Sequence, residues 1–162
     1  MMNKLDIENN WLDQTLALSN MSVEEGNHPF GALLVIGDDK VLDAKNNVNT
    51  EQDVTCHAEM NLVRRACQTL TQAQRKQAVL YTSTEPCAMC AGAIYWSGIK
   101  QVVFACSGKK LNDIAGDSLI CHSDDVYKGA IDPPNVCQSS SQHIIKKAEQ
   151  QRLTAVKEGE RD

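Results

Sequence analysis

Two short motifs carry side chains that could bind a metal ion and move a proton. Cys87 and Cys90 are separated by two residues and directly follow Pro86. His57 lies upstream, two residues before Glu59. Three protein ligands leave one position of a zinc ion open to water, whose pKa then falls to about 7. The motifs therefore predict a hydrolytic zinc centre with His57, Cys87 and Cys90 as ligands. Glu59, a carboxylate that is not a ligand, would carry the proton.

Both motifs fall at the start of a predicted helix. Apolar residues recur at helical spacing over residues 56–70, where Thr55 is a suitable N-cap. A second helix is predicted over residues 87–97, ended by Gly98. Unpaired N–H groups and partial positive charge at a helix N-terminus favour the thiolate that binds metal. One helical turn would bring both cysteines to the same end of their helix.

The elements around these helices predict an α/β fold. A first helix is expected over residues 7–25. Strands are expected at four places: residues 30–36, 41–44, 78–83 and 101–105. The first two should form an antiparallel hairpin, and the strands that are joined by helices should be parallel. Gly31 in the first strand indicates that another part of the backbone approaches closely there.

The remaining segments carry weaker signals. Residues 46–53 are polar and lack an apolar face, so a loop is predicted there rather than a helix. Its place just before His57 suits a binding role. Residues 71–77 are predicted to be a polar connector. After Cys106 we expect mostly irregular chain, followed by a last charged helix over residues 143–156.

Length and composition indicate one domain over residues 1–162, with its core at about 7–106 and a less certain segment at 107–162. No apolar run is long enough for a membrane span. The N-terminus lacks the apolar region of a signal peptide, so a cytoplasmic location is expected. The odd number of cysteines, 7, argues against a disulfide framework. The formal net charge of −5 and the few aromatic residues favour a small neutral substrate over a polynucleotide.

The cysteine pair by itself is also compatible with two different kinds of site. A pair with this spacing occurs in redox sites and in structural zinc sites. A structural site would need a fourth ligand, for which Cys56 is the nearest candidate. Neither alternative has a use for Glu59.

A longer stretch carries a family resemblance. The run from Leu80 to Trp96, LYTSTEPCAMCAGAIYW, is similar to bacterial guanine deaminases, as are the segments PFGA at 29–32 and NNV at 46–48. With His57 and Glu59, it resembles the cytidine-deaminase-like superfamily, in which H-x-E and P-C-x-x-C mark the zinc deaminases. Transfer-RNA adenosine deaminases share the zinc motifs, the asparagine at position 46 and the segment CAGA. The resemblance covers residues 27–105.

This resemblance implies a three-layer α/β/α fold with a central mixed sheet of about five strands, one Zn²⁺ ion per chain and a homodimer. It implies that Asn46 hydrogen-bonds the substrate ring, that Phe30 lines the pocket or stacks on the base, and that the Ala58 backbone contacts the leaving side. Asp117 is a weak match to an aspartate that helps guanine deaminases choose a purine. Phe30 could equally be a core residue, and Asn46 a turn residue.

The motifs and the resemblance are therefore compatible with four functions. The first is hydrolytic deamination of a nucleobase or nucleoside, with guanine converted to xanthine and ammonia. The second is deamination of adenosine to inosine in tRNA, for which a base would be flipped into the same pocket. The third is deamination of cytosine or cytidine. The fourth is a zinc-binding module without catalysis.

Overall fold

A computed structural model describes residues 1–116, 119 and 121–159. Five strands form one sheet in the order β2-β1-β3-β4-β5. The strands are β1 (Gly31–Ile36), β2 (Asp39–Lys45), β3 (Val79–Thr84), β4 (Gln101–Cys106) and β5 (Asn135–Gln138). The helices are α1 (Lys4–Glu24), α2 (Val48–Glu51), α3 (Ala58–Thr69), α4 (Gln72–Gln77), α5 (Ala88–Ser97), α6 (Gly108–Ala115), α7 (Ser123–Val126) and α8 (Gln142–Lys157).

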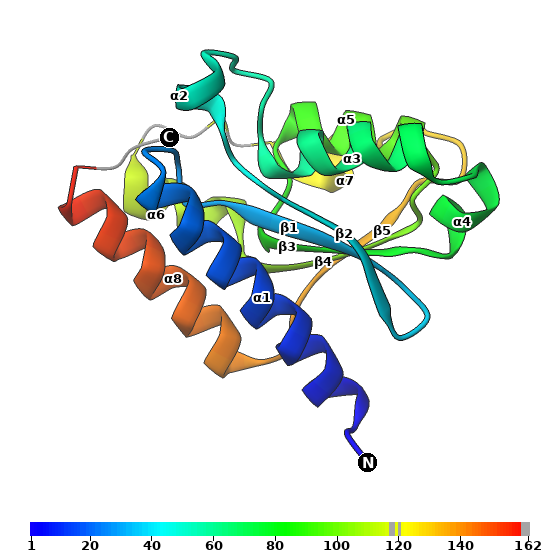
Figure 1. The fold of residues 1–162 in the computed structure, drawn as a ribbon, viewed down its shortest axis with the longest axis horizontal. Helices are drawn as coiled ribbons and strands as arrows, with labels where there is room; N and C mark the ends of the chain where they lie inside the picture. The colour runs from blue at the N-terminus through cyan, green and yellow to red at the C-terminus, as the bar shows by residue number, and fades with distance from the viewer. Residues whose placement is uncertain (117–118, 120, 160–162) are drawn as a thin grey trace.

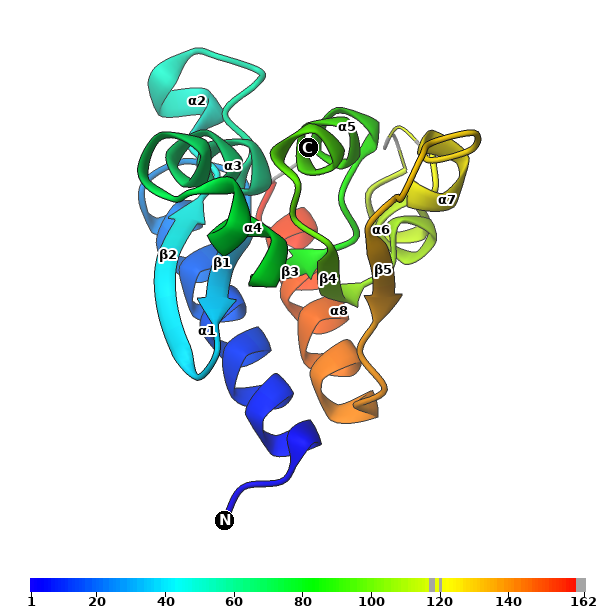
Figure 2. The same cartoon turned by 90° about the vertical axis from the view of Figure 1, so that its right-hand side faces the viewer.

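Helices cover both faces of this sheet. Figures 1 and 2 show α1 and α8 side by side on one face, and α3 and α5 on the other. The expected three-layer α/β/α architecture with a mixed five-stranded sheet is confirmed. No helix of the described residues is both long and apolar enough to pass through a bilayer.

Strand directions follow the connections. β1 runs antiparallel to both of its neighbours, β2 and β3, so β2 and β3 point the same way. β4 and β5 continue in that direction. The predicted hairpin and the parallel strands after helical connections are confirmed. β5 was missed because its four residues are mostly exposed and carry no apolar run.

The core forms two layers because side chains of a strand alternate between the faces of the sheet. Ala32 and Leu34 of β1 belong to the apolar cluster beneath α3 and α5. Leu33 and Val35 belong to the cluster beneath α1 and α8. Each face of β1 is thus buried, which accounts for the continuous apolar run in its sequence.

Gly31 lies where α1 crosses the start of the sheet. A Cβ atom at this position would be 2.4 Å from the carbonyl oxygen of Thr15 and 2.6 Å from the Leu18 Cβ. No larger residue fits unless α1 moves, which confirms the close backbone approach predicted at Gly31. The contact also fixes the chain just before β1, where Phe30 lies.

The prediction of a loop without helix at residues 46–53 was wrong, because Val48–Glu51 form the short helix α2. Its N–H groups are satisfied by a residue that is distant in the sequence. Asn27 is fully buried, and its Oδ1 accepts hydrogen bonds from the backbone N–H groups of Asn49 and Thr50, both at 3.0 Å. This capping is non-local, so the composition of the segment gave no sign of it.

The polar connector at residues 71–77 also contains a helix, α4. Thr71 and Gln74 form a capping box, in which each side chain accepts a hydrogen bond from the backbone N–H of the other. The spacing T-x-x-Q is a sequence signature of a helix start. This helix could therefore have been predicted from the sequence.

Candidate functional site

The candidate site lies at one edge of the sheet, where the parallel strands end. Asn46 directly follows β2, Cys87 lies three residues after β3, and Gly108 lies two residues after β4. Phe30 directly precedes β1, which runs the other way and so begins at the same edge. Ligands of α/β proteins typically bind at the carboxyl ends of strands.

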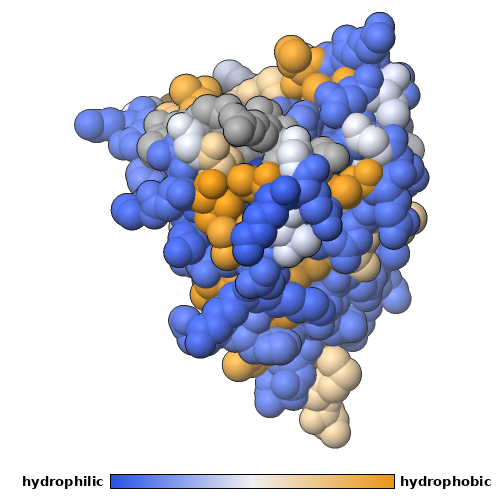
Figure 3. Space-filling model, turned by 90° about the vertical axis from the view of Figure 1, so that its left-hand side faces the viewer, coloured by the Kyte–Doolittle hydropathy of each residue, from blue (hydrophilic) through white to orange (hydrophobic). Residues whose placement is uncertain are grey.

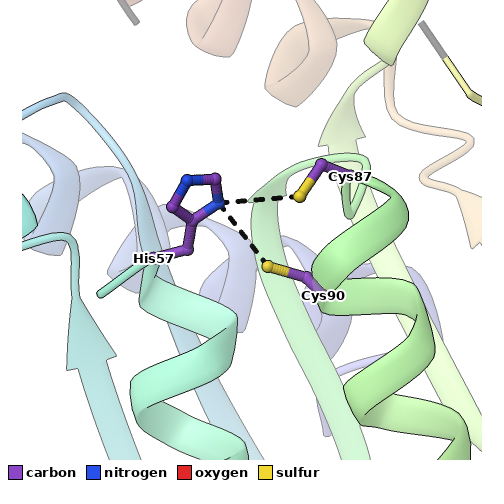
Figure 4. A group of neighbouring side chains, drawn as sticks. All are labelled: His57, Cys87 and Cys90. Atoms are coloured by element: carbon purple, nitrogen blue, oxygen red, sulfur yellow. Dashed lines mark hydrogen bonds between the residues drawn. The ribbon is translucent and has the colours of Figure 1, made fainter. Parts of the chain in front are cut away.

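Three ligand-type side chains meet at the starts of two helices (Figure 4). His57 is the N-cap of α3, Cys87 is the N-cap of α5, and Cys90 lies in the first turn of α5. The His57 Nδ1 atom lies 3.6 Å from the Sγ atom of each cysteine. One ligand atom from each residue lies within 4.8 Å of the others. The structure therefore brings together the three residues that the sequence predicts as ligands.

Thr55 was expected to cap the helix that begins near His57, and that expectation was wrong. The N-cap position belongs to His57, whose side chain makes no capping hydrogen bond. Thr55 instead donates its hydroxyl to the Asp53 carboxylate, at 2.7 Å. The His57 ring faces the two cysteine sulfurs (Figure 4).

The chemistry of this donor set fits zinc. One imidazole nitrogen and two sulfurs are borderline-soft ligands of the kind that a three-ligand catalytic zinc site uses. The hydrogen bond with Cys90 lowers the pKa of the Cys87 thiol to about 4, and the His57 contact acts in the same direction. The same hydrogen bond and burial raise the pKa of Cys90. A lowered thiol pKa favours the thiolate, which is the form that binds a metal.

Glu59 lies beside this cluster in a buried position. Only 5% of its surface is exposed. Its Oε1 accepts a hydrogen bond from the Thr82 hydroxyl at 2.5 Å, and its Oε2 lies 3.6 Å from the Cys90 Sγ. Burial raises the pKa of Glu59 above its usual value, although the Thr82 hydrogen bond opposes this. A carboxyl group in such a site can both accept and return a proton.

A cavity of about 580 Å³ opens onto these residues. Its wall includes His57, Glu59 and Cys87 together with Phe30 and Asn46. The wall is mainly apolar, as the walls of small-molecule binding sites commonly are.

The side of the molecule that carries α2, α6 and the C-terminal end of α8 is mostly hydrophilic, with hydrophobic side chains grouped in its middle (Figure 3).

The four predicted substrate contacts have different outcomes. Asn46 is 1% exposed and lines the cavity, and its Oδ1 accepts the Val48 backbone N–H at 3.1 Å. Phe30 is partly buried and also lines the cavity. Ala58 is fully buried in the core as the first residue of α3 and is not part of the cavity wall. Asp117 lies outside the described residues.

The sequence did not single out several polar residues near the site. Thr82 was seen only as part of a strand, although its place two residues before Thr84 puts it on the same face of β3. Glu85 lines the cavity and accepts the Gly108 backbone N–H at 3.2 Å. His122 lies 3.4 Å from the other oxygen of Glu85. No local pattern marks His122, because only the fold brings it to Glu85.

Comparison with known proteins identifies the family. Residues 6–106 match the family model of the cytidine and deoxycytidylate deaminase zinc-binding region. A probable cytosine deaminase of Schizosaccharomyces pombe is 40% identical over 111 residues, which cover 68% of this chain and 67% of that protein. The guanine deaminase of Bacillus subtilis is 44% identical over 91 residues, 56% of this chain and 58% of that enzyme. A tRNA-specific adenosine deaminase of Bacillus subtilis is 33% identical over 129 residues, 75% and 80% of the two chains.

Solved structures agree on the fold. A guanine deaminase from Nitrosomonas europaea superposes with a TM-score of 0.72 at 21% identity, over 90% of this chain and 82% of that one. A tRNA:A34 deaminase superposes with a TM-score of 0.65 at 25% identity, over 80% and 96% of the two chains. From the matched family region and the paired metal motifs, the chain belongs to the cytidine and deoxycytidylate deaminase family, the zinc-type hydrolases that deaminate nucleobases or nucleosides.

Proposed function

We propose that this protein deaminates guanine to xanthine and ammonia. The observation that carries the proposal is the His57, Cys87 and Cys90 cluster, which lies beside buried Glu59 in one cavity. The choice of guanine is supported by the 44% identity to the Bacillus subtilis guanine deaminase. That identity is higher than the identities to the cytosine and tRNA deaminases, although it extends over fewer residues.

The proposed roles follow from the geometry. His57, Cys87 and Cys90 would hold zinc, which when bound lowers the pKa of a water molecule toward neutrality. Glu59 takes one proton of the attacking water and delivers it to the amino nitrogen of the substrate, and the second proton of that water ends on the adjacent ring nitrogen. The C–N bond breaks, ammonia leaves, and the ring carbon keeps the oxygen as a carbonyl. The Thr82 hydroxyl donates a hydrogen bond to Oε1 of Glu59. Because Oε1 is engaged in this way, Oε2 is the atom that accepts and donates the proton.

The walls of the cavity would orient the ring. The Oδ1 of Asn46 is engaged by Val48, so its amide N–H₂ group is the part that we propose donates to the substrate. Phe30 offers an apolar surface on which a flat base can pack.

Two other substrates are each favoured by one observation. Cytosine is supported by the Schizosaccharomyces pombe relative, whose match spans 68% of this chain. Adenosine in tRNA is supported by the match that covers 80% of the Bacillus subtilis tRNA deaminase. The formal net charge of −5 opposes a polynucleotide, because phosphate contacts dominate the affinity of such complexes.

Ammonia release from a panel of substrates tests the proposal. The panel contains guanine, guanosine, cytosine, cytidine, adenine and a tRNA anticodon stem-loop, each with the zinc-loaded protein. We expect the highest kcat/KM for guanine, with xanthine and ammonia formed in equal amounts. Preference for cytosine or for the stem-loop would replace guanine with that substrate. Bound zinc without ammonia from any substrate would instead indicate a non-catalytic zinc module.

We also propose that the protein is a homodimer. Trp96 of α5 is 84% exposed and Ile131 is 86% exposed. Tyr95 connects the two, because its ring centre lies 5.1 Å from that of Trp96 and its hydroxyl donates to the Ile131 carbonyl oxygen at 3.2 Å. Large apolar side chains at one exposed place are typical of an interface. A second copy of this chain would cover them.

A further inference from the structure

A long side chain of the C-terminal helix α8, that of Arg152, extends to a residue of the cavity wall. Arg152 is only 1% exposed and is among the largest fully buried side chains of the described residues. Its guanidinium carbon lies 4.7 Å from the centre of the Phe30 ring, the geometry of a cation–π contact. Phe30 in turn lines the cavity that holds His57 and Glu59. Arg152 is therefore one contact away from the place where the substrate ring would lie.

The turn of α8 that carries Arg152 is held firmly. Ile144 and Ala148 pack into the core beneath α1 and α8. The neighbouring Gln151 donates its side-chain amide to the Leu16 carbonyl oxygen at 2.8 Å and to the Asn20 Oδ1 at 2.7 Å. Because both of these bonds are made to α1, Arg152 has a rigid base from which to reach Phe30.

The backbone of Phe30 is held from the strand side, and its side chain packs against the apolar cluster beneath α3 and α5. Its carbonyl oxygen accepts the Asn46 N–H at 3.0 Å, and its N–H donates to the His28 carbonyl oxygen at 2.9 Å. These bonds fix the main chain, whereas the rotamer of the ring depends on the side chains that pack against it. Arg152 adds a contact on the face of the ring from helix α8, which lies on the other side of the sheet.

We propose that Arg152 is a positioning residue, which holds the Phe30 ring as a wall of the cavity and so gives the C-terminal helix a part in substrate binding. The effect on the substrate rests on the proposed deaminase function, whereas the hold on the ring does not. A guanidinium is suited to the task because it is planar, always charged and weakly hydrated, so it stacks on aromatic rings better than an ammonium group.

Kinetics of two substitutions test this role. Arg152→Met keeps an unbranched side chain but removes the cation, and Arg152→Lys keeps the charge without the planar group. We expect Arg152→Met to raise KM for guanine about tenfold, the scale of a lost desolvated cation–π contact, with kcat within about twofold. Arg152→Lys should fall between it and the wild type. Lys146→Met, an exposed change on the same helix, is the matched control and should leave KM unchanged.

A double-mutant cycle shows whether Arg152 acts through Phe30. In a Phe30→Leu background, Arg152→Met should change KM by less than about twofold, because the ring that it positions is already absent. Independent effects that multiply in the double variant would overturn the proposal. So would a lower melting temperature of Arg152→Met with no change in KM, since that result indicates a purely structural role.

Crystal structures of the zinc-loaded wild type and of Arg152→Met, or of Arg152→Lys if the methionine variant does not fold, decide the role without any substrate. We expect the Phe30 ring to adopt another rotamer or to lose ordered density in the variant. A ring in the same place would overturn the proposal. If the wild type releases no ammonia from guanine, the proposed substrate is wrong, but the position of the Phe30 ring still decides the role of Arg152.

Discussion

Glu59 is held by a neighbour that the sequence motifs do not include. Thr82 lies on β3 with no exposed surface, and its hydroxyl donates to Glu59 Oε1. Because Thr82 is not part of the cavity wall, it acts on the reaction only through Glu59. The proton carrier and its orienting hydroxyl thus come from different elements, α3 and β3.

Removing this hydroxyl should slow the reaction without weakening substrate binding. Thr82→Val leaves one buried oxygen of Glu59 without its donor and lets the carboxyl group rotate. We expect kcat to fall about 10- to 100-fold, part of the 10²–10⁴-fold that positioned proton transfer supplies, with KM nearly constant. Thr82→Ser, which keeps the hydroxyl, should stay close to the wild type. Steady-state kinetics with guanine measure both, and a Thr82→Val enzyme with normal kcat would contradict this role.

At the scale of elements, the starts of α3 and α5 bring the ligands together. The C-x-x-C spacing could be assigned to a helix start from the sequence, because Pro86 precedes α5 and Gly98 ends it. The start of α3 was recognised from the apolar spacing of residues 56–70, with an error of two residues. The C-cap Gly98 has φ of 81°, a conformation that favours glycine. Local signals therefore sufficed for the metal-binding half of the site.

The substrate-binding half depends on contacts between distant residues. The cap of α2 comes from Asn27, the carboxylate of Glu85 meets His122, and Arg152 reaches Phe30 from the last helix. No sequence window contains both partners of these contacts, so periodicity and capping rules could not predict them. β5 is similar, since its assignment depends on pairing with β4 rather than on its own apolar pattern.

The contact between α1 and the start of β1 gives a stability prediction. Gly31→Ala would place a Cβ against backbone atoms of α1, so we expect a loss of about 1–3 kcal/mol or more in the free energy of unfolding. Gly92→Ala is the matched control, because its Cβ would meet no atom within 4 Å in helix α5. Replacing a helical glycine with alanine should stabilise by up to about 1 kcal/mol. Urea unfolding measures both, and equal effects would contradict this account of the contact.

In the whole molecule, the two helical layers have different roles. α3 and α5 carry the metal-binding side chains, while α1 and α8 support the sheet and the Phe30 wall from the other face. Trp96 lies on α5, so a partner subunit that covers it would contact the helix that carries both cysteines. The proposed dimer would thus pack against the C-terminal end of the helix whose N-terminal end carries the cysteines.

The proposed dimer makes a prediction about mass. Trp96→Ser removes the largest exposed apolar side chain on α5 and should shift the protein from dimer to monomer at micromolar concentration. Ile7→Ser, a change of another exposed apolar residue on α1, is the control and should leave the mass unchanged. Size-exclusion chromatography with light scattering measures the mass. A wild-type monomer, or a Trp96→Ser variant that stays dimeric, would refute this interface.

Zinc content and ammonia release, measured together for Glu59→Gln and for the wild type, decide whether Glu59 carries the proton beside a zinc ion held by other residues. Glutamine keeps the size of the side chain and can still bond Thr82, but it cannot carry a proton. We predict about one zinc ion per chain in both proteins, and a loss of at least about 10²-fold in ammonia release from guanine by the variant. Unchanged ammonia release, or zinc lost together with activity, would show that Glu59 does not have the role assigned to it.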